Sequence, residues 1–411
     1  MSGAPITGSQ PATAAATWTQ RAALIVGFCF LTNMVDGKDV NIMSFIRADL
    51  SADWGVADDV MGYVLSAGTL GMGIGALLIA PFADRFGRKP VIMFALDLMT
   101  AGMVASALVK SVNWLMFARL VVGTGIGTVL ATMAALAAES APVGKQDMAV
   151  GLVQAGFPLA AVATGFVSAA FLETHGWQAL LMWAAVITLV LLPLAQMILP
   201  ARLPGVEHNA ETSRAALSAL FGPDLRGRTI LLMIAVFMGL MVLYSMLSWI
   251  TKLASGAGLS DADSIYAGAV YNIGAFVGTS GMGFLTLHVR PARLTPLLLA
   301  LAGVALLIFG NVSMSVGGAL AMAFIIGLTL QGGYNGMWPI AAGAFPAETR
   351  ATGIGWVMGI GRGGAVVGPI MAGYLLAAEV SLPMILAIYC IPLAMCGACA
   401  FFVRRAPQAT A

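Results

Sequence analysis

Charged residues are scarce in this chain: only 9% of its 411 residues are Asp, Glu, Lys or Arg, whereas 60% are hydrophobic. An ordinary soluble domain has about a quarter of its residues charged, so the composition excludes that class. The mean hydropathy of +0.93 indicates a polytopic membrane protein instead. The apolar runs reach about 20 residues, which fits membrane-spanning helices and is too long for the strands of a transmembrane barrel.

The residues that a metal site or a hydrolytic centre would need are also few. The three histidines, His175, His208 and His288, fall in predicted loops or at span ends, and no HExxH or GxSxG motif is present. The four cysteines lie in apolar segments, and we interpret them as buried side chains. We therefore expect no metal, no cofactor and no enzymatic activity. The net charge of +2 gives no indication of nucleic-acid binding.

The apolar runs predict twelve membrane-spanning helices in two six-helix pseudo-repeats, an all-α membrane protein. The spans fall near 18–46, 57–80, 88–109, 113–139, 147–172, 177–199, 228–252, 263–288, 293–312, 316–344, 350–377 and 381–403. A long connection separates the first six from the last six, as in proteins built from two repeats. The predicted parts are a disordered tail that is not a cleaved signal (1–17), an N-terminal bundle (18–199), a cytoplasmic linker (200–227), a C-terminal bundle (228–405) and a short tail (406–411).

Basic residues set the expected orientation. Fourteen Lys and Arg residues fall in one set of loops and span ends, and only Arg47, Lys110 and Lys252 fall in the other set. Cytoplasmic loops carry the excess of basic residues in membrane proteins. The bias predicts that both termini are cytoplasmic.

A short charged string, Asp36-Gly37-Lys38-Asp39, interrupts the first predicted span. Each charge costs about 2.5–3.5 kcal/mol on membrane-insertion scales, so such residues face a protein interior or a water-filled pathway. Asp36 and Asp39 are three residues apart and share one helix face. We interpret them as a proton-coupling pair, with a structural charge network as the alternative.

Transport of an anion would need a cation near the middle of the membrane. Arg362 lies about 18 Å into its span at 1.5 Å per residue, and its planar guanidinium matches a carboxylate. We predict Arg362 as the main carboxylate anchor; a salt bridge to Asp36, Asp39 or Asp97 is the alternative. Asn33 is a further candidate. The other predicted substrate contacts are polar, charged or aromatic residues in apolar spans: Lys38, Arg119, Gln154, Tyr271, Asn272, Gln331, Tyr334, Asn335 and Trp338.

Three motifs carry a family resemblance. Asp84-Arg85-Phe86-Gly87-Arg88-Lys89 resembles the loop signature of the major facilitator superfamily, as do Arg119 with its following G-x-G-x-G and the P-x-E-x-R element that contains Glu348 and Arg350. The continuation into the GIGRGG segment around Arg362, together with D-G-x-D in the first span, is similar to the aromatic acid:proton symporter family. The predicted cytoplasmic gate comprises Asp84, Arg85, Gly87, Arg88, Glu139, Glu348 and Arg350.

The resemblance implies a twelve-helix fold and proton-coupled uptake of carboxylates across a bacterial inner membrane. We expect small organic acids, protons and the lipid bilayer as partners, and a chain that works as a monomer. The substrates expected are aromatic carboxylates such as 4-hydroxybenzoate and benzoate, or breakdown products such as muconate. Proton-antiport export of organic anions or drugs is the alternative.

Two departures from the family pattern matter. Ala80 stands where the loop signature usually has Gly, and Lys38 stands where the family usually has an aromatic or apolar residue. Lys38 leaves two interpretations open. It could be a second cationic anchor, which would favour a dicarboxylate or a lactone acid, or it could neutralise Asp36 or Asp39.

Overall fold

The computed structural model describes residues 18–142, 145–199, 218–286 and 288–403. The predicted tails at 1–17 and 406–411, and most of the predicted linker, lie outside these residues. Within the described part of the chain the regular secondary structure is helical, with no strand. The prediction of an all-α protein is confirmed.

The helices follow the predicted spans closely. The first set comprises α1 (Gln20–Trp54), α2 (Asp58–Ile74) with its π-helical continuation η1 (Gly75–Ile79), α3 (Phe82–Phe86), α4 (Arg88–Leu108), α5 (Val112–Ser140), α6 (Gln146–Gln154) and α7 (Gly156–Ile198). Helix α7 contains two spans, because Gly176 at φ 75° breaks it into two helices. A positive φ of this kind is readily adopted only by glycine.

The second set contains the remaining long helices. It comprises α9 (Arg226–Gly256), α10 (Asp261–Leu285), α11 (Pro291–Asn311), α12 (Val316–Asn335), α13 (Met337–Ala344), α14 (Ala347–Ala377) and α15 (Leu382–Phe402). Helices α12 and α13 form one span with a break at Gly336.

Ten helical segments of the described chain are long and apolar enough to cross a membrane. Helices α1 and α10 are long enough but are not among the ten. Charged residues in α1, and glycine and polar residues in α10, reduce their hydropathy. The membrane class is therefore confirmed, whereas the count of twelve spans stays a prediction.

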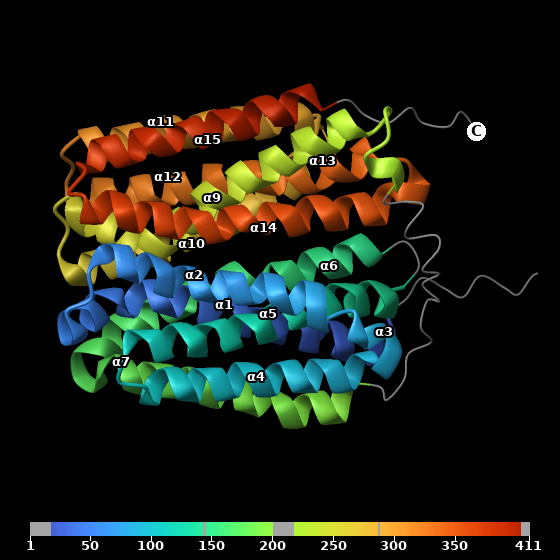
Figure 1. Ribbon diagram of the computed structural model, residues 1–411, viewed down its shortest axis with the longest axis horizontal. Helices are drawn as coiled ribbons and strands as arrows, with labels where there is room; N and C mark the ends of the chain where they lie inside the picture. The colour runs from blue at the N-terminus through green and yellow to red at the C-terminus, as the bar shows by residue number, and fades with distance from the viewer. Residues whose placement is uncertain (1–17, 143–144, 200–217, 287, 404–411) are drawn as a thin grey trace, which may run out of the picture.

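The helices pack mainly within each set. In the first set α1 packs on α7, and α5 packs on α2 and α4; in the second, α10 packs on α12, α9 on α14 and α11 on α15. Figure 1 shows the first set as the blue to green ribbons below and the second set as the yellow-green to red ribbons above. The two sets meet where α2 packs on α14 and α7 packs on α10.

Glycine allows the closest of these contacts. A Cβ on Gly123 would collide with the backbone of Gly68, and one on Gly127 would collide with that of Met72. Small residues let membrane helices approach until their backbones touch. The G-x-G-x-G face after Arg119 therefore serves helix packing.

Candidate functional site

A cavity of about 190 Å³ lies between the two sets of helices. It extends from the middle of the bundle toward the end at which α1 begins, because its lining includes Asn33 and Asp36 in the middle of α1, Gln154 at the end of α6 and the last part of α12. The structure brings together at this cavity nine of the candidate site residues: Asn33, Asp36, Gln154, Asn272, Gln331, Tyr334, Asn335, Trp338 and Arg362.

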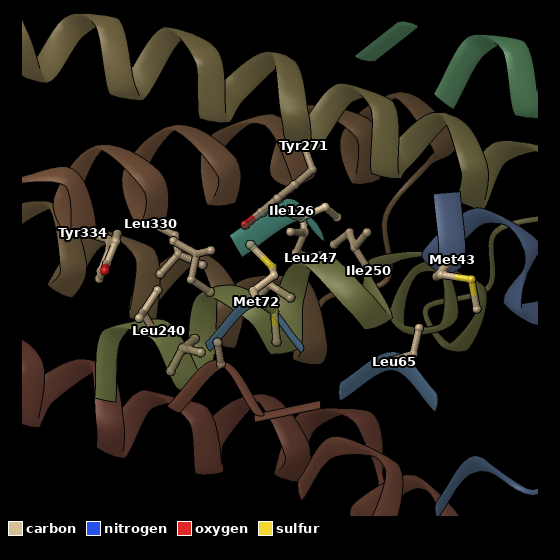
Figure 2. Close-up of a cluster of buried hydrophobic side chains, with 14 of the residues drawn as sticks. Met43, Leu65, Met72, Ile126, Leu240, Leu247, Ile250, Tyr271, Leu330 and Tyr334 are labelled. Atoms are coloured by element: carbon tan, nitrogen blue, oxygen red, sulfur yellow. The ribbon is translucent and has the colours of Figure 1, made fainter. Parts of the chain in front are cut away.

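Apolar side chains form much of the cavity wall. Met72 on α2, Leu240 and Leu247 on α9, and the ring of Tyr334 on α12 all line it. Figure 2 shows these four side chains among the buried apolar residues that the two sets contribute. A mostly apolar wall with a few placed polar groups is typical of small-molecule sites.

The charges of the cavity are Asp36 on α1 and Arg362 on α14. Asp36 is only 2% exposed, and its Oδ1 has no hydrogen-bond partner within the described chain. Arg362 is close enough for its charge to act on Asp36, yet among the described residues neither side chain forms an ion pair. The Tyr244 hydroxyl on α9 lies against the Arg362 guanidinium and also lines the cavity.

Sequence analysis missed Tyr244. It is the one tyrosine of an otherwise apolar span, and that isolation was the available signal.

Amide side chains supply the other polar groups of the cavity. Asn33 Nδ2 donates to Gln154 Oε1 at 2.7 Å, and Asn335 Nδ2 donates to Thr279 Oγ1 at 2.7 Å. Asn272 Nδ2 donates to Asn41 Oδ1 at 3.2 Å and so joins α10 to α1 across the two sets. These bonds hold the amides in fixed orientations around the cavity.

Asp39 lies in a different environment. Lys38 Nζ contacts Asp39 Oδ1 and donates to the Ala184 carbonyl at 2.9 Å, and Arg119 Nη2 donates to the Asp39 carbonyl at 2.7 Å. All three side chains are buried. The contacts join α1 to α5 and α7 within the first set.

The contacts of this cluster bear on the two interpretations of Lys38. Within the described chain, Lys38 and Arg119 are not among the cavity-lining residues, and Lys38 Nζ contacts Asp39 Oδ1. Gly37 beside it lets α7 approach, because a Cβ there would collide with the Phe157 backbone.

Tyr271, also predicted as a substrate contact, does not line the cavity in the part of the chain that the structure describes. It is fully buried. Its hydroxyl has no hydrogen-bond partner among the described residues. Figure 2 shows Tyr271 and Tyr334 as two separate side chains from neighbouring helices.

The predicted gate residues lie at the end of the bundle where α4 begins and α5 ends. Arg88 forms an ion pair with Glu139, and its Nη1 donates to the Thr132 carbonyl at 3.3 Å. Gly87, at φ 94°, makes the turn between α3 and α4.

The remaining gate residues are only partly placed. Arg350 Nε donates to the Phe345 carbonyl at 3.4 Å, and the Arg85 guanidinium lies over the Phe86 ring. The side chains of Asp84 and Glu348 are outside the described residues, so their part in the cytoplasmic gate stays a prediction.

The opposite end of the bundle carries contacts that sequence analysis missed. Asp58 on α2 lies 3.4 Å from Lys252 Nζ on α9 and 3.9 Å from Arg47 Nη1 on α1. The hydroxyls of Tyr63 on α2 and Tyr374 on α14 are hydrogen-bonded at 2.8 Å. These residues join the two sets at the end of the bundle opposite the predicted gate. In the sequence, the charged residues among them appear only as a cluster beside predicted spans, and such a cluster does not show which residues pair.

Two sets of membrane-spanning helices around a central cavity, with an arginine and a carboxylate on opposite walls, define a membrane transporter rather than an enzyme. The profile of the Major Facilitator Superfamily matches residues 23–343. The chain belongs to this superfamily.

Curated relatives agree with the more specific resemblance. The gallate transporter of Pseudomonas putida is 30% identical over 398 residues, covering 90% of this chain and 89% of the relative. The 4-hydroxybenzoate transporter of Pseudomonas putida is 29% identical over 402 residues, with 90% of each covered. The 3-(3-hydroxy-phenyl)propionate transporter of Escherichia coli (strain K12) is 31% identical over 362 residues, covering 87% of this chain and 88% of the relative.

Solved structures share the fold. A bacterial homolog of the human lysosomal transporter Spinster, in an inward-facing and unoccupied conformation, superposes with a TM-score of 0.75. It is 15% identical, and the match covers 95% of this chain and all of the other. At this identity the likeness concerns the fold alone.

Proposed function

We propose that this protein imports small aromatic monocarboxylates into the cell together with protons. The observation that carries the proposal is the cavity with Arg362 on one wall, Asp36 on the other and apolar and aromatic side chains between them. Arg362, with Tyr244 against it, binds the substrate carboxylate, because a guanidinium is the planar, permanently charged donor that a carboxylate prefers. Tyr334, Trp338, Gln331, Asn335, Gln154 and Asn272 line the remainder and contact the ring.

The size of the cavity supports a single-ring substrate. Drug-sized ligands occupy pockets of about 300–1,000 Å³, whereas an apolar cavity of about 150 Å³ admits benzene. The cavity of about 190 Å³ fits one ring with a carboxylate better than a large drug molecule. The names of the relatives, transporters of gallate, 4-hydroxybenzoate and 3-(3-hydroxy-phenyl)propionate, are consistent with this class.

The charge arrangement supports a monocarboxylate rather than a dicarboxylate. Arg362 is the cation that lines the cavity within the described residues, and Lys38 is engaged with Asp39. A second carboxylate would therefore meet no second cation and would lie near Asp36. Muconate should accordingly compete poorly with aromatic acids.

Asp36 carries the coupled proton in this proposal. It lines the cavity, it has an oxygen without a hydrogen-bond partner in the described chain, and its counter-charge is Arg362 across the cavity. When a substrate carboxylate binds Arg362, the attraction that favours ionised Asp36 weakens and Asp36 takes up a proton. Asp39 and Lys38 form a structural ion pair that positions α1, and Arg119 supports it from α5.

The orientation follows from the basic residues, with both termini in the cytoplasm and the protein in the inner membrane. In that orientation the Asp58 and Tyr63–Tyr374 contacts close the outer end, and the cavity lies on their cytoplasmic side. The Arg88–Glu139 pair and Arg350 lie at the cytoplasmic gate. The two sets of helices rock about the cavity to expose it alternately, and a single chain contains the complete site.

The test is uptake into proteoliposomes. Purified protein should accumulate radiolabelled 4-hydroxybenzoate when an inward proton gradient is imposed and should not do so without it. Benzoate and protocatechuate should compete, and muconate should compete weakly. Lys110→Ala and Asp224→Asn, at exposed positions, serve as charge-matched controls for substitutions of Arg362 and Asp36. If preloaded acid instead leaves faster under the gradient, the protein is an exporter and the import proposal is wrong.

A further inference from the structure

Two buried oxygen atoms, one turn apart on α1, lack a hydrogen-bond donor. Asn33 and Asp36 both line the cavity and are 4% and 2% exposed. Neither Asn33 Oδ1 nor Asp36 Oδ1 has a hydrogen-bond partner within the described residues. A buried acceptor left unpaired is costly, so it indicates a partner that arrives in another state of the protein.

The Asn33 amide is held in one orientation, so it cannot rotate to point its NH2 group at Asp36 in place of its oxygen. Its Nδ2 is already engaged with Gln154 Oε1 at 2.7 Å, which fixes the orientation of the amide group. Residues spaced i and i+3 lie on the same helix face, with Cβ atoms about 5–6 Å apart. A carboxyl group and an amide on these positions can therefore reach each other.

Chemistry identifies the missing partner. An ionised carboxylate and an amide oxygen only accept hydrogen bonds, so they cannot bond to each other. A protonated carboxyl group has one O–H donor. One proton on Asp36 therefore supplies the donor that both oxygen atoms lack.

We propose that Asn33, oriented by Gln154, is the acceptor for the proton on Asp36 and so a positioning residue for proton binding. This inference rests on the proposed role of Asp36 as the proton carrier. The other groups that face Asp36 are Arg362 on α14, Tyr244 on α9 and Asp39 on the same helix. Arg362 favours the ionised form of Asp36, and Asn33 favours the protonated form. Substrate that occupies Arg362 shifts the balance toward Asn33.

The test reads the proton directly, without transport. Full-length protein in lipid nanodiscs is titrated from about pH 5 to about pH 9, a range that brackets perturbed carboxyl groups. The infrared carbonyl band of the protonated acid is assigned to Asp36 by its loss in Asp36→Asn. In Asn33→Leu, which has similar size and no acceptor, the midpoint should fall by about one pH unit and the band should move to higher frequency, as expected when one hydrogen bond is lost.

Matched variants separate this role from a general effect of mutating the cavity. Asn335→Leu removes a cavity amide that is bonded to Thr279 on α10 instead, and it should leave the midpoint where it is. Asn33→Ser retains an acceptor, so its titration midpoint should lie close to that of the wild type. If Asn33→Leu does not fold, the midpoints of Asn33→Ser and Asn33→Ala are compared instead.

An unchanged midpoint and band in Asn33→Leu would overturn the inference, and so would the absence of any Asp36 carboxyl band in the wild type. Because the titration needs no substrate movement, its outcome is separate from that of the uptake assay. If no acid is transported but the Asp36 band titrates and shifts in Asn33→Leu, the transport proposal fails and the Asn33–Asp36 pair stands.

Discussion

Asp36 and Asp39 are three residues apart on one helix, yet they lie in opposite kinds of environment. Asp39 contacts Lys38, its neighbour in sequence, and its backbone carbonyl accepts from Arg119 within the first set of helices. Asp36 borders the cavity between the sets, and its counter-charge belongs to the second set. In the proposed transport cycle, relative movement of the two sets would change the surroundings of Asp36 and leave those of Asp39 intact.

The difference indicates what a coupling carboxylate needs. A carboxylate with a permanent local counter-ion stays ionised and contributes to structure. A carboxylate whose counter-ion can be taken by a substrate changes its protonation when that substrate binds. The comparison supports the proposal that Asp36 is the functional acid and Asp39 a structural one, and the following predictions test it and the packing around it.

Removing the counter-charge of Asp36 should have the largest effect. Arg362→Ala should reduce 4-hydroxybenzoate uptake about thirtyfold or more, because it removes the cation that pairs with the substrate carboxylate, and truncating one partner of a buried charge pair costs about 2–5 kcal/mol. Initial uptake rates in proteoliposomes measure this loss. Arg362→Lys should recover part of the lost uptake rate, because lysine keeps the positive charge but cannot form the bidentate contact of a guanidinium. Wild-type uptake rates in Arg362→Ala would contradict the assignment of Arg362 as the residue that binds the substrate carboxylate.

Breaking the Asp39 pair should reduce stability rather than coupling. Lys38→Met and Asp39→Asn should each destabilise the fold by about 3–5 kcal/mol, because each leaves a buried charge without its partner. The double variant Lys38→Met/Asp39→Asn should be much closer to wild type. Thermal unfolding in detergent, followed by fluorescence-detected gel filtration, measures the three variants together. Additive losses in the double variant would contradict the ion-pair assignment.

The glycine between the two acids should matter for packing. Gly37→Ala places a methyl group against the Phe157 backbone, and overpacking of this kind costs about 1–3 kcal/mol. The unfolding temperature should fall in Gly37→Ala and should stay unchanged in Gly27→Ala, where the added atom meets nothing within 4 Å. Equal unfolding temperatures for the two variants would mean that α1 and α7 are not closely packed there.

The smallest effect should come from the proposed outer contacts. Asp58 is partly exposed and pairs with Lys252 at 3.4 Å, and exposed ion pairs contribute about 0.2–1 kcal/mol. Asp58→Asn should therefore shift the balance of inward-open and outward-open states only a few-fold. Spin labels at exposed positions of α2 and α14 should show a modest increase in the outward-open population. An unchanged distribution would exclude this pair from the gate.

Much of the fold was predictable because apolar runs and glycine have strong physical consequences. The break at Gly176 fell between two predicted spans, and the glycines after Arg119 are of the kind that allows close helix contact. The placement of Arg362 and Asp36 at one cavity was also predictable in outline, since charges at mid-membrane rarely face lipid.

The partners of these residues were less predictable. Nothing in the sequence distinguishes Lys38 as a counter-ion of Asp39 from Lys38 as a substrate anchor, because a lysine side chain can extend in either direction along its helix. Tyr244 and the Asp58–Lys252 contact depend on how helices distant in sequence pack. Such contacts are set by tertiary structure, so a local pattern can single out these residues but does not identify their partners.

The most direct test of the central claim compares two transport modes in Asp36→Asn and in the charge-neutral double variant Lys38→Met/Asp39→Asn. Gradient-driven accumulation of 4-hydroxybenzoate needs a proton carrier, whereas exchange of labelled for unlabelled substrate at equal pH needs only binding and movement. The account predicts that Asp36→Asn loses accumulation and retains exchange, and that the double variant retains both. Accumulation that survives in Asp36→Asn and is lost in the double variant would assign the proton to Asp39 and contradict the account.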